Sequence, residues 1–280
     1  MFSLEEATQK LSEAEIESPR FEAQLLLMIA LGVTRTQVLA GTYPPPTYDQ
    51  ETRFMALIEA RTRRIPFAYL RGSQEFYGLE FVVSPSVLIP RPETELLVER
   101  VLEVARKKKG AFRFADVGTG TGCIPISILA NTSPNVSAIA IDLSPLALEI
   151  ALTNAKRHGV LQRVELLQTD LLQGVEAHSL DFIVSNPPYI KTETLNTLQP
   201  EVRDHEPRLA LDGGEDGLQI YRRLFPEIAR VLKPKGSFAV EVGAGQAPAV
   251  SEIAERAGFQ NLRVSRDFAD IERVVEGELP

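Results

Sequence analysis

Short apolar runs alternate with helix-like stretches from Phe112 to the end of the chain, and this alternation limits the possible folds more than any other feature. Seven runs are predicted to be strands: 112–117, 137–141, 164–167, 180–184, 237–242, 262–264 and 271–275. Because helices usually connect parallel strands, the alternation predicts an α/β domain with a doubly wound, mostly parallel sheet. No helix pattern separates the last two runs, so we expect them to form an antiparallel pair at a sheet edge.

The residues ahead of this sheet domain carry helix signals and no strand pattern. Ser3 with Glu6 has the spacing of a capping box, and apolar residues follow at helical intervals. Two short strand-like segments then flank Gly78, as in a β-hairpin. We therefore predict three parts: a small all-helical domain over 1–73, a hairpin and linker over 74–90, and the sheet domain over 91–280.

A long helix is predicted at the start of the sheet domain. The segment Pro90–Glu95 opens it with acidic residues, and Lys107, Lys108 and Lys109 are expected in its last turn, ahead of Gly110. Acid at the start and base at the end suit the helix macrodipole, so the helix should run as far as the lysines.

Charge and cysteine content exclude several classes of protein. The formal net charge of −8 argues against an extended, nonspecific grip on nucleic acid, which usually needs a basic face. A single cysteine, Cys123, excludes an internal disulfide framework, and with three histidines far apart in sequence we expect no metal site. The amino-terminal residues are rich in glutamate and no apolar run is long enough to span a bilayer, so we expect a cytoplasmic protein.

The run at 180–184 leads into Asn186-Pro187-Pro188-Tyr189, which we predict to be the catalytic centre. Open α/β sheets place their chemistry at the carboxyl ends of strands. An NH₂ group conjugated to a carbonyl or a ring is a poor nucleophile. The Asn186 side-chain oxygen and the Pro187 carbonyl could each accept one of its N–H groups and so aim the nitrogen lone pair. Two prolines stiffen the loop, and Tyr189 could lie flat against a planar amide or base. The alternative is an ordinary strand-ending turn.

A glycine-rich turn follows the first strand and opens a helix, the place where backbone can approach a ligand closely. Its residues are Gly118, Thr119, Gly120, Thr121 and Gly122, preceded by Asp116-Val117. Cys123 stands where the dinucleotide fingerprint has its third glycine, which favours a ligand without a pyrophosphate. The alternative is a turn that serves packing alone.

Two acids are candidates for binding the rest of such a ligand. Asp142, 24 residues after Gly118, ends the second strand where an acid would accept both hydroxyls of a ribose. Asp170, ending the third strand, could accept from an adenine amino group while Leu171 covers the ring. The alternatives are an acid that precedes a helix for Asp142 and an ordinary loop acid for Asp170.

Taken together, these motifs resemble the class I S-adenosylmethionine-dependent methyltransferases that act on NH₂ groups. The wider pattern is similar to the HemK/PrmC family, the peptide chain release factor glutamine methyltransferases, over essentially the whole chain. The segments that carry the resemblance are 64–72, 76–78, 89–95, 204–207 and 211–214. Leu171 departs from some members, which carry an aromatic residue beside the adenine.

The resemblance implies a seven-stranded sheet with S-adenosylmethionine as cofactor, and the glutamine of the Gly-Gly-Gln tripeptide in release factors as substrate. It implies catalysis by Asn186, Pro187, Pro188 and Tyr189, and cofactor contacts from Gly118, Thr119, Gly120, Thr121, Gly122, Asp142, Asp170, Leu171 and Asn186. We expect a monomer in the free state that binds neither membrane nor nucleic acid directly.

Three classes of function remain open at this point: a protein-glutamine methyltransferase, an adenine-N6 methyltransferase of DNA or RNA, and a nucleotide-dependent oxidoreductase. The third needs the pyrophosphate turn that Cys123 interrupts, and it leaves Asn186–Tyr189 without a task. The second should bring a basic face with stacking aromatics. Arg61, Arg63, Arg64 and Arg71 form the tight arginine cluster, which ion pairing or solvation explains equally well. The helical domain favours a protein partner.

Overall fold

The computed structural model describes residues 3–280, which divide into two compact units. The first unit holds the chain up to Ser73 together with Gln199–His205, and the second holds Gln74–Leu198 together with Glu206–Pro280. A short segment from the carboxyl-terminal half of the chain thus belongs to the amino-terminal unit. Within residues 3–280, no helix has both the length and the hydropathy needed to cross a membrane.

Helices make up the first unit: α1 (Leu4–Glu13), α2 (Pro19–Leu31), α3 (Arg35–Ala40), α4 (Tyr48–Thr62), α5 (Phe67–Arg71) and α9 (Pro200–His205). The predicted capping box is present at the start of α1, where Ser3 Oγ accepts from Glu6 N at 3.1 Å. Leu11, Leu26 and Ile58, from three of these helices, are buried in one core. Helices α1, α2 and α4 are therefore held by the apolar stripes that they present to one another, whereas α9 buries no residue.

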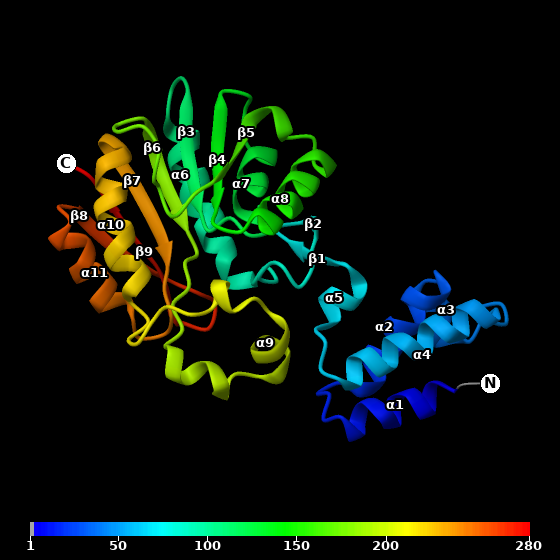
Figure 1. The fold of residues 1–280 in the computed structure, drawn as a ribbon. Helices are drawn as coiled ribbons and strands as arrows, with labels where there is room; N and C mark the ends of the chain where they lie inside the picture. The colour runs from blue at the N-terminus through cyan, green and yellow to red at the C-terminus, as the bar shows by residue number, and fades with distance from the viewer. Residues whose placement is uncertain (1–2) are drawn as a thin grey trace. The chain divides into compact units, whose positions relative to one another are not determined.

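A seven-stranded sheet forms the centre of the second unit (Figure 1). Its strands stand in the order β5 (Val164–Gln168), β4 (Val136–Asp142), β3 (Phe112–Val117), β6 (Leu180–Ser185), β7 (Leu232–Glu241), β9 (Glu272–Glu278) and β8 (Gln260–Arg266). Neighbours from β5 to β7 are parallel, and β9 is antiparallel to both β7 and β8. The predicted mostly parallel sheet is confirmed. Of the antiparallel pair only β8 lies at the edge, because β9 inserts between β7 and β8.

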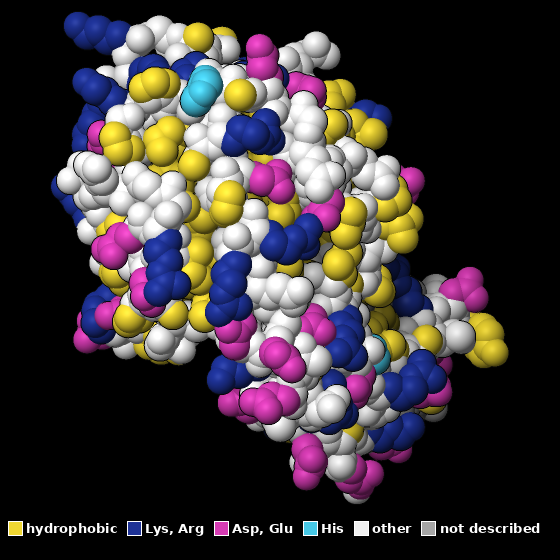
Figure 2. All heavy atoms as spheres, turned by 60° about the vertical axis from the view of Figure 1, so that its left-hand side comes forward, with side chains coloured by type: hydrophobic (Ala, Val, Ile, Leu, Met, Phe, Trp, Pro, Cys, Tyr) yellow, Lys and Arg dark blue, Asp and Glu magenta, His cyan; other side chains and the backbone are white. Residues whose placement is uncertain are grey.

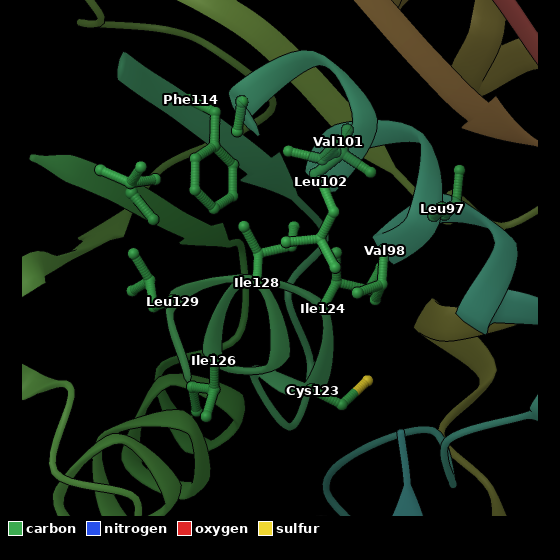
Figure 3. Packing of buried hydrophobic residues seen from close by; sticks show 14 of the residues in the cluster. Leu97, Val98, Val101, Leu102, Phe114, Cys123, Ile124, Ile126, Ile128 and Leu129 are labelled. Atoms are coloured by element: carbon green, nitrogen blue, oxygen red, sulfur yellow. The ribbon is translucent and has the colours of Figure 1, made fainter. Parts of the chain in front are cut away.

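Helices cover both faces of this sheet (Figure 1). One face carries α6 (Glu95–Lys107), α7 (Cys123–Ala130) and α8 (Pro145–Arg157), and the other carries α10 (Gln219–Val231) and α11 (Ala247–Arg256). Side chains along a strand alternate between the two cores, so Phe182 packs with the first set and Ile183 with the second. Figure 3 shows the first core, where Leu102 of α6 and Ile128 of α7 gather around Phe114 of β3.

A small hairpin precedes the sheet domain, as predicted. Its strands are β1 (Ser73–Phe76) and β2 (Leu79–Val82). The buried Asn154 of α8 holds the second strand, since its Oδ1 accepts from Val82 N at 2.8 Å and its Nδ2 donates to Val82 O at 3.1 Å. Short 3-10 helices fill the connections: η1 (Pro92–Thr94), η2 (Leu161–Arg163), η3 (Thr192–Thr197) and η4 (Arg208–Ala210).

Helix α6 ends earlier than the lysine pattern predicts. Its last residue is Lys107, and Lys108 already has an extended backbone. The Lys108 ammonium forms an ion pair with the buried Asp181 carboxylate near the start of β6, which Lys233 Nζ also contacts at 3.0 Å. A buried carboxylate needs such partners, and this need draws Lys108 out of the helix.

Candidate active site

Neighbouring parallel strands end together at one edge of the sheet. Val117 on β3 is level with Ile141 on β4 and with Ser185 on β6. The next residue along each strand is therefore Gly118, Asp142 or Asn186, and these three follow the same register line. The segment after β5 joins them, because Thr169 N donates to Asp142 O at 3.2 Å. The structure thus brings the glycine turn, both acids and the Asn186 loop to one edge.

Packing explains one glycine of the turn and leaves two unexplained. Gly118, Gly120 and Gly122 all have left-handed backbones, with φ of +78°, +53° and +76°. A Cβ on Gly122 would lie 2.9 Å from Ile126 Cδ1 and 3.2 Å from Ala151 Cβ, so the packing of α7 against α8 requires this glycine. A Cβ on Gly118 would meet nothing nearer than Asn186 O at 3.9 Å, and one on Gly120 would meet nothing within 4 Å. These two positions leave room for a ligand.

Asp116, the residue before Val117, is a buried acid that the sequence analysis quoted but gave no role. It is fully buried, and its Oδ2 accepts from Thr119 Oγ1 at 2.6 Å. No group of residues 3–280 hydrogen-bonds to its Oδ1. Burial raises the pKa of Asp116 to about 7, the Asp142 charge adds to this effect, and the Thr119 hydrogen bond opposes it. An unpartnered carboxylate oxygen at this edge is suited to a cationic ligand.

Asp142 links the glycine turn to the helix that follows β4. Its Oδ2 accepts from Gly120 N at 2.9 Å and its Oδ1 from Ser144 N at 2.9 Å. Burial raises the pKa of Asp142, and these backbone hydrogen bonds oppose the rise. The side-chain cap of α8 is Ser144, whose Oγ accepts from Ala147 N at 3.3 Å. Each Asp142 oxygen retains a lone pair, so both can still accept from hydroxyl groups.

Asp170 and Leu171 lie in the turn that follows β5. The strand ends at Gln168, so Asp170 stands two residues beyond it instead of ending it. Its Oδ2 accepts from Arg223 Nη2 at 2.6 Å, which leaves Oδ1 for another donor. Leu171 has a φ of +53°, an uncommon backbone for a residue with a side chain, and it packs partly buried against the core beneath α10. Such strain is found where a side chain must point in one particular direction.

The Asn186–Tyr189 loop is held at both ends. Before it, Ser185 Oγ donates to Val117 O at 2.7 Å. After it, Ile190 N donates to Leu211 O at 3.0 Å, and Ile190 O accepts from Gly213 N at 2.8 Å. A Cβ on Gly213 would lie only 2.8 Å from Tyr189 Cα. The loop backbone therefore fits against Gly213 at a distance that no larger residue allows.

Side chains that the sequence analysis missed surround the Asn186 amide. Asn186 Nδ2 donates to Thr94 Oγ1 at 3.1 Å, and Thr94 Oγ1 donates to Glu241 Oε2 at 2.6 Å. Tyr189 OH donates to Glu241 Oε1 at 3.4 Å. Glu241 ends β7 and is 2% exposed. Burial raises its pKa to about 7 against the lowering effects of Thr94, Arg273 and Tyr189. The sequence signal was an acid within an apolar run.

Comparison with known proteins places this chain in a family. Residues 3–72 match the family described as the PrmC N-terminal domain, and residues 92–215 match the methyltransferase small domain. The release factor glutamine methyltransferase of Caulobacter vibrioides is 43% identical over 271 residues, covering 97% of this chain and 93% of that protein. The chain belongs to the release factor glutamine methyltransferase family. The family member from Geobacter sulfurreducens is 42% identical over 269 residues, covering 96% of this chain and 93% of that protein.

The solved structures agree on the fold. The ribosomal protein L11 methylase of Lactobacillus delbrueckii subsp. bulgaricus aligns with a TM-score of 0.51 at 22% identity, covering 71% of this chain and 84% of that chain. Such a likeness shows the class I methyltransferase architecture and nothing of the substrate. The family is dependent on S-adenosylmethionine, which bears the cationic sulfonium and ammonium groups, the ribose and the adenine that the predicted site would have to hold.

The residues at the sheet edge fit this cofactor. The unpartnered Asp116 oxygen complements a cationic group, and the two Asp142 oxygens retain lone pairs for the ribose hydroxyls. A side chain at Gly118 or Gly120 would meet almost nothing, so the turn leaves space next to Asp142, which accepts from Gly120 N. The charge, the hydrogen-bonding capacity and the available space at this edge therefore all suit S-adenosylmethionine.

Proposed function

We propose that this protein transfers a methyl group from S-adenosylmethionine to the side-chain amide nitrogen of the glutamine in the Gly-Gly-Gln tripeptide of peptide chain release factors. Family membership over nearly the full chain supports the reaction class. The observation that carries the proposal is the fixed Asn186 amide, whose Nδ2 donates to Thr94 and whose Oδ1 is thereby turned away from Thr94. That oxygen is the acceptor that a glutamine NH₂ needs.

The catalytic residues act by orientation. Asn186 Oδ1 and the Pro187 carbonyl accept one N–H each from the substrate amide, which aims its lone pair. Pro188 contributes rigidity and no competing donor, and Tyr189 lines the slot with its ring. When bound, the cofactor would supply a methyl group carried on a sulfonium: the N–C bond would form as the S–CH₃ bond breaks with its electron pair left on sulfur, and the nitrogen would release one proton to water.

The cofactor contacts are assigned by position at the sheet edge. The turn from Gly118 to Gly122, with Thr119 and Thr121, presents backbone to the amino-acid part of the cofactor. Asp142 receives the ribose hydroxyls, Asp170 receives the adenine amino group, and Leu171 covers the ring. Asn186 borders both the cofactor and the substrate. The register of the strand ends supports this arrangement.

Asp212 and Glu93, two acids close to the loop, are not suited to act as strong bases. Asp212 accepts from Thr192 Oγ1 at 2.6 Å, from Gly214 N at 3.1 Å and from Arg208, and these partners lower its pKa. Such a carboxylate accepts a proton poorly near neutral pH. Glu93 lies in the first turn of η1, where an acid stabilises the start of a helix. Loss of the proton after methyl transfer therefore suffices.

The arginine cluster does not support the adenine methyltransferase alternative. Arg61 pairs with Glu22 at 2.5 Å and with Glu201 at 3.0 Å, and Arg64 pairs with Glu201 at 2.9 Å, all within the first unit. These guanidinium groups are therefore engaged with protein carboxylates. Figure 2 shows a face on which Lys and Arg side chains alternate with Asp and Glu and do not gather into a basic patch. An adenine methyltransferase must extract a stacked base, which costs a few kcal/mol, and it therefore needs a basic face with aromatic side chains that stack on the base.

A release factor substrate also implies the compartment of this protein and its binding partner. We assign it to the cytoplasm, the compartment of translation, as a monomer that binds its protein substrate without membrane or direct nucleic-acid contact. Truncation before Phe81 should abolish methylation of the release factor while retaining cofactor binding, provided that the remaining domain stays folded. A truncated protein that still methylates release factor would show that the helical domain is dispensable for recognition.

The test supplies radiolabelled S-adenosylmethionine with three acceptors in parallel: unmodified release factor, the same factor with Gln→Asn in its Gly-Gly-Gln loop, and unmethylated DNA. We expect label on the unmodified factor alone. Label on DNA but not on the factor would refute the proposal, and equal label on the Gln→Asn factor would show that another residue is the acceptor.

A further inference from the structure

One buried carboxylate is connected to both ends of the catalytic loop. Glu241 Oε2 lies 2.6 Å from Thr94 Oγ1, which in turn lies 3.1 Å from Asn186 Nδ2. Glu241 Oε1 lies 3.4 Å from the hydroxyl of Tyr189. Asn186 and Tyr189 are the first and last residues of the loop, so the carboxylate reaches one end through a hydroxyl and the other end directly.

The direction of these hydrogen bonds follows from what each group can donate. An ionised carboxylate only accepts, so the single Thr94 hydroxyl hydrogen points to Glu241. The Thr94 oxygen then has only lone pairs to offer, and the group of Asn186 that faces it must be the NH₂. A reversed amide would place Asn186 Oδ1 against an oxygen without a free hydrogen. The chain Glu241–Thr94–Asn186 therefore selects one of the two amide orientations.

We propose that Glu241 is a positioning residue for methyl transfer: acting through Thr94, it turns the Asn186 carbonyl oxygen toward the substrate amide, and it holds Tyr189 at the other end of the loop. This role rests on the proposed function of Asn186. Glu241 itself touches neither substrate nor cofactor in this scheme, and its effect is exerted on the geometry of the loop.

The usual structural role of Thr94 does not explain this arrangement. A threonine at the start of a helix normally caps it by accepting a backbone N–H. Thr94 precedes α6 but has helical backbone angles and makes no side-chain cap hydrogen bond. Its hydroxyl is buried and is committed to Glu241 and Asn186. Removal of the hydroxyl should therefore act on the loop and leave the start of α6 intact.

Protonation of Glu241 would remove its preference for one of the two Asn186 amide orientations. Among residues 3–280, the titratable and polar groups that act on Glu241 are Thr94 and Glu93 from η1, Cys123 from α7, Tyr189 from the loop, Tyr221 from α10, whose hydroxyl donates to Glu241 O, and Arg273 from β9. A protonated carboxyl can donate to Thr94, which frees the hydroxyl hydrogen to point at Asn186 and favours the reversed amide. Since burial raises the Glu241 pKa to about 7, turnover at saturating substrates should fall as the pH decreases through this value.

The first arm of the experiment compares full-length Thr94→Val, which loses the hydroxyl at nearly constant shape, with Thr94→Ser, which keeps it. At saturating cofactor and release factor, we expect kcat of the valine variant to fall about tenfold or more, as for a misplaced catalytic group. The serine variant should stay within about threefold of wild type. Binding of S-adenosylhomocysteine, measured by calorimetry, should be nearly unchanged in both. A valine variant with wild-type kcat, or a serine variant as slow as valine, would overturn the proposal.

The second arm separates positioning from stability. Glu241→Gln should abolish the fall in kcat on acidification. If kcat of this variant still falls as in wild type, the pH dependence belongs to another group, such as Asp116, and not to Glu241. Asp181→Asn is the matched control, because Asp181 is also a buried carboxylate of the sheet but is paired with Lys108 and Lys233. It should lower the unfolding temperature and keep kcat. An Asp181→Asn variant as slow as Thr94→Val would indicate general destabilisation.

A third measurement does not depend on which molecule accepts the methyl group. The Asn186 side-chain NH₂ signals, assigned by their loss in Asn186→Asp, should exchange with solvent more slowly in wild type and Thr94→Ser than in Thr94→Val. Equal exchange in all three would overturn the hydrogen-bond relay. Failure of wild type to label release factor would instead refute the proposed function, while the exchange comparison would still decide the relay.

Discussion

Asp142 Oδ2 accepts a hydrogen bond of 2.9 Å from the backbone N–H of Gly120, so the acid at the end of β4 and the turn at the end of β3 form one structural unit. The same carboxylate accepts from Ser144 N through its other oxygen. The acid therefore holds the turn in place while offering its remaining lone pairs at the sheet edge. The hydrogen bond from Gly120 fixes the distance between the two segments before a ligand binds to both of them.

Replacement of this acid should weaken cofactor binding. Asp142→Ala would remove the proposed charge-assisted contact to the ribose hydroxyls, and such a contact is worth about 1.5–3 kcal/mol. It also releases the Gly120 amide. Calorimetry with S-adenosylhomocysteine should show this loss, and Asp170→Ala should show a smaller one because Asp170 is partly exposed and paired with Arg223. Unchanged affinity of Asp142→Ala would move the ribose site elsewhere.

Removal of the catalytic amide should affect turnover far more than cofactor binding. Asn186→Ala would delete the acceptor that we propose orients the substrate nitrogen, so kcat should fall by about two orders of magnitude or more. Affinity for S-adenosylhomocysteine should change much less. Asn131→Ala is a suitable control, since the Asn131 side chain donates to the carbonyl of Ser127 at the end of α7 and makes no hydrogen bond with the loop within residues 3–280. A variant at position 186 with near-normal turnover would refute the role of this residue.

The close approach of Gly213 to the loop gives a steric prediction. In Gly213→Ala the new Cβ would lie 2.8 Å from Tyr189 Cα and 2.9 Å from Pro188 O, so the loop backbone must shift and kcat should fall. Gly236→Ala is the matched control, because its Cβ would lie 2.8 Å from Lys233 O, far from the loop along β7. Both variants should lose stability in thermal unfolding, but the control should keep its kcat. Equal kcat for the two variants would contradict the steric role.

Two buried acids should make stability depend on pH in a definite direction. Burial raises the pKa of Asp116 and of Glu241 to about 7, above the ordinary values of 3.8 and 4.5. The folded state therefore binds more protons than the unfolded state between these values, and the free energy of unfolding decreases as the pH rises through about 7. Urea unfolding of Asp116→Asn and Glu241→Gln at pH values below and above this range should show a weaker decrease than wild type. If the free energy of unfolding decreases as steeply in both variants as in wild type, these two acids are not the source of the pH dependence.

Local patterns were sufficient to predict the strands of the sheet and the carboxyl ends of the five parallel strands to within one residue, although Asp170 lies two residues beyond the end of β5. The capping box at Ser3, the alternation from Phe112 and the missing helix between the last two strands each depend on residues close in sequence. Because parallel strands end together, the polar residues after the apolar runs were also expected at one sheet edge, and the register of β3, β4 and β6 confirms this. Where a long-range contact intervened the prediction failed, as at Lys108, which leaves α6 to pair with Asp181.

The relay around Asn186 could not be predicted in the same way. Thr94 and Glu241 lie 147 positions apart, and only the fold brings them within 2.6 Å. In sequence, Thr94 reads as a residue near a helix start and Glu241 as the polar end of a strand. The one local signal was a carboxylate inside a run that should be buried, since a buried charge needs a partner. The sequence does not say which partner it has.

Mass spectrometry of the release factor after incubation with S-adenosylmethionine tests the central claim most directly. The peptide that contains Gly-Gly-Gln should gain the mass of one methyl group on the glutamine side chain with the wild-type protein, and no such gain should occur with Asn186→Ala. A methyl group on any other residue, or an equal gain with Asn186→Ala, would contradict the proposed reaction and the role of the Asn186 loop in it.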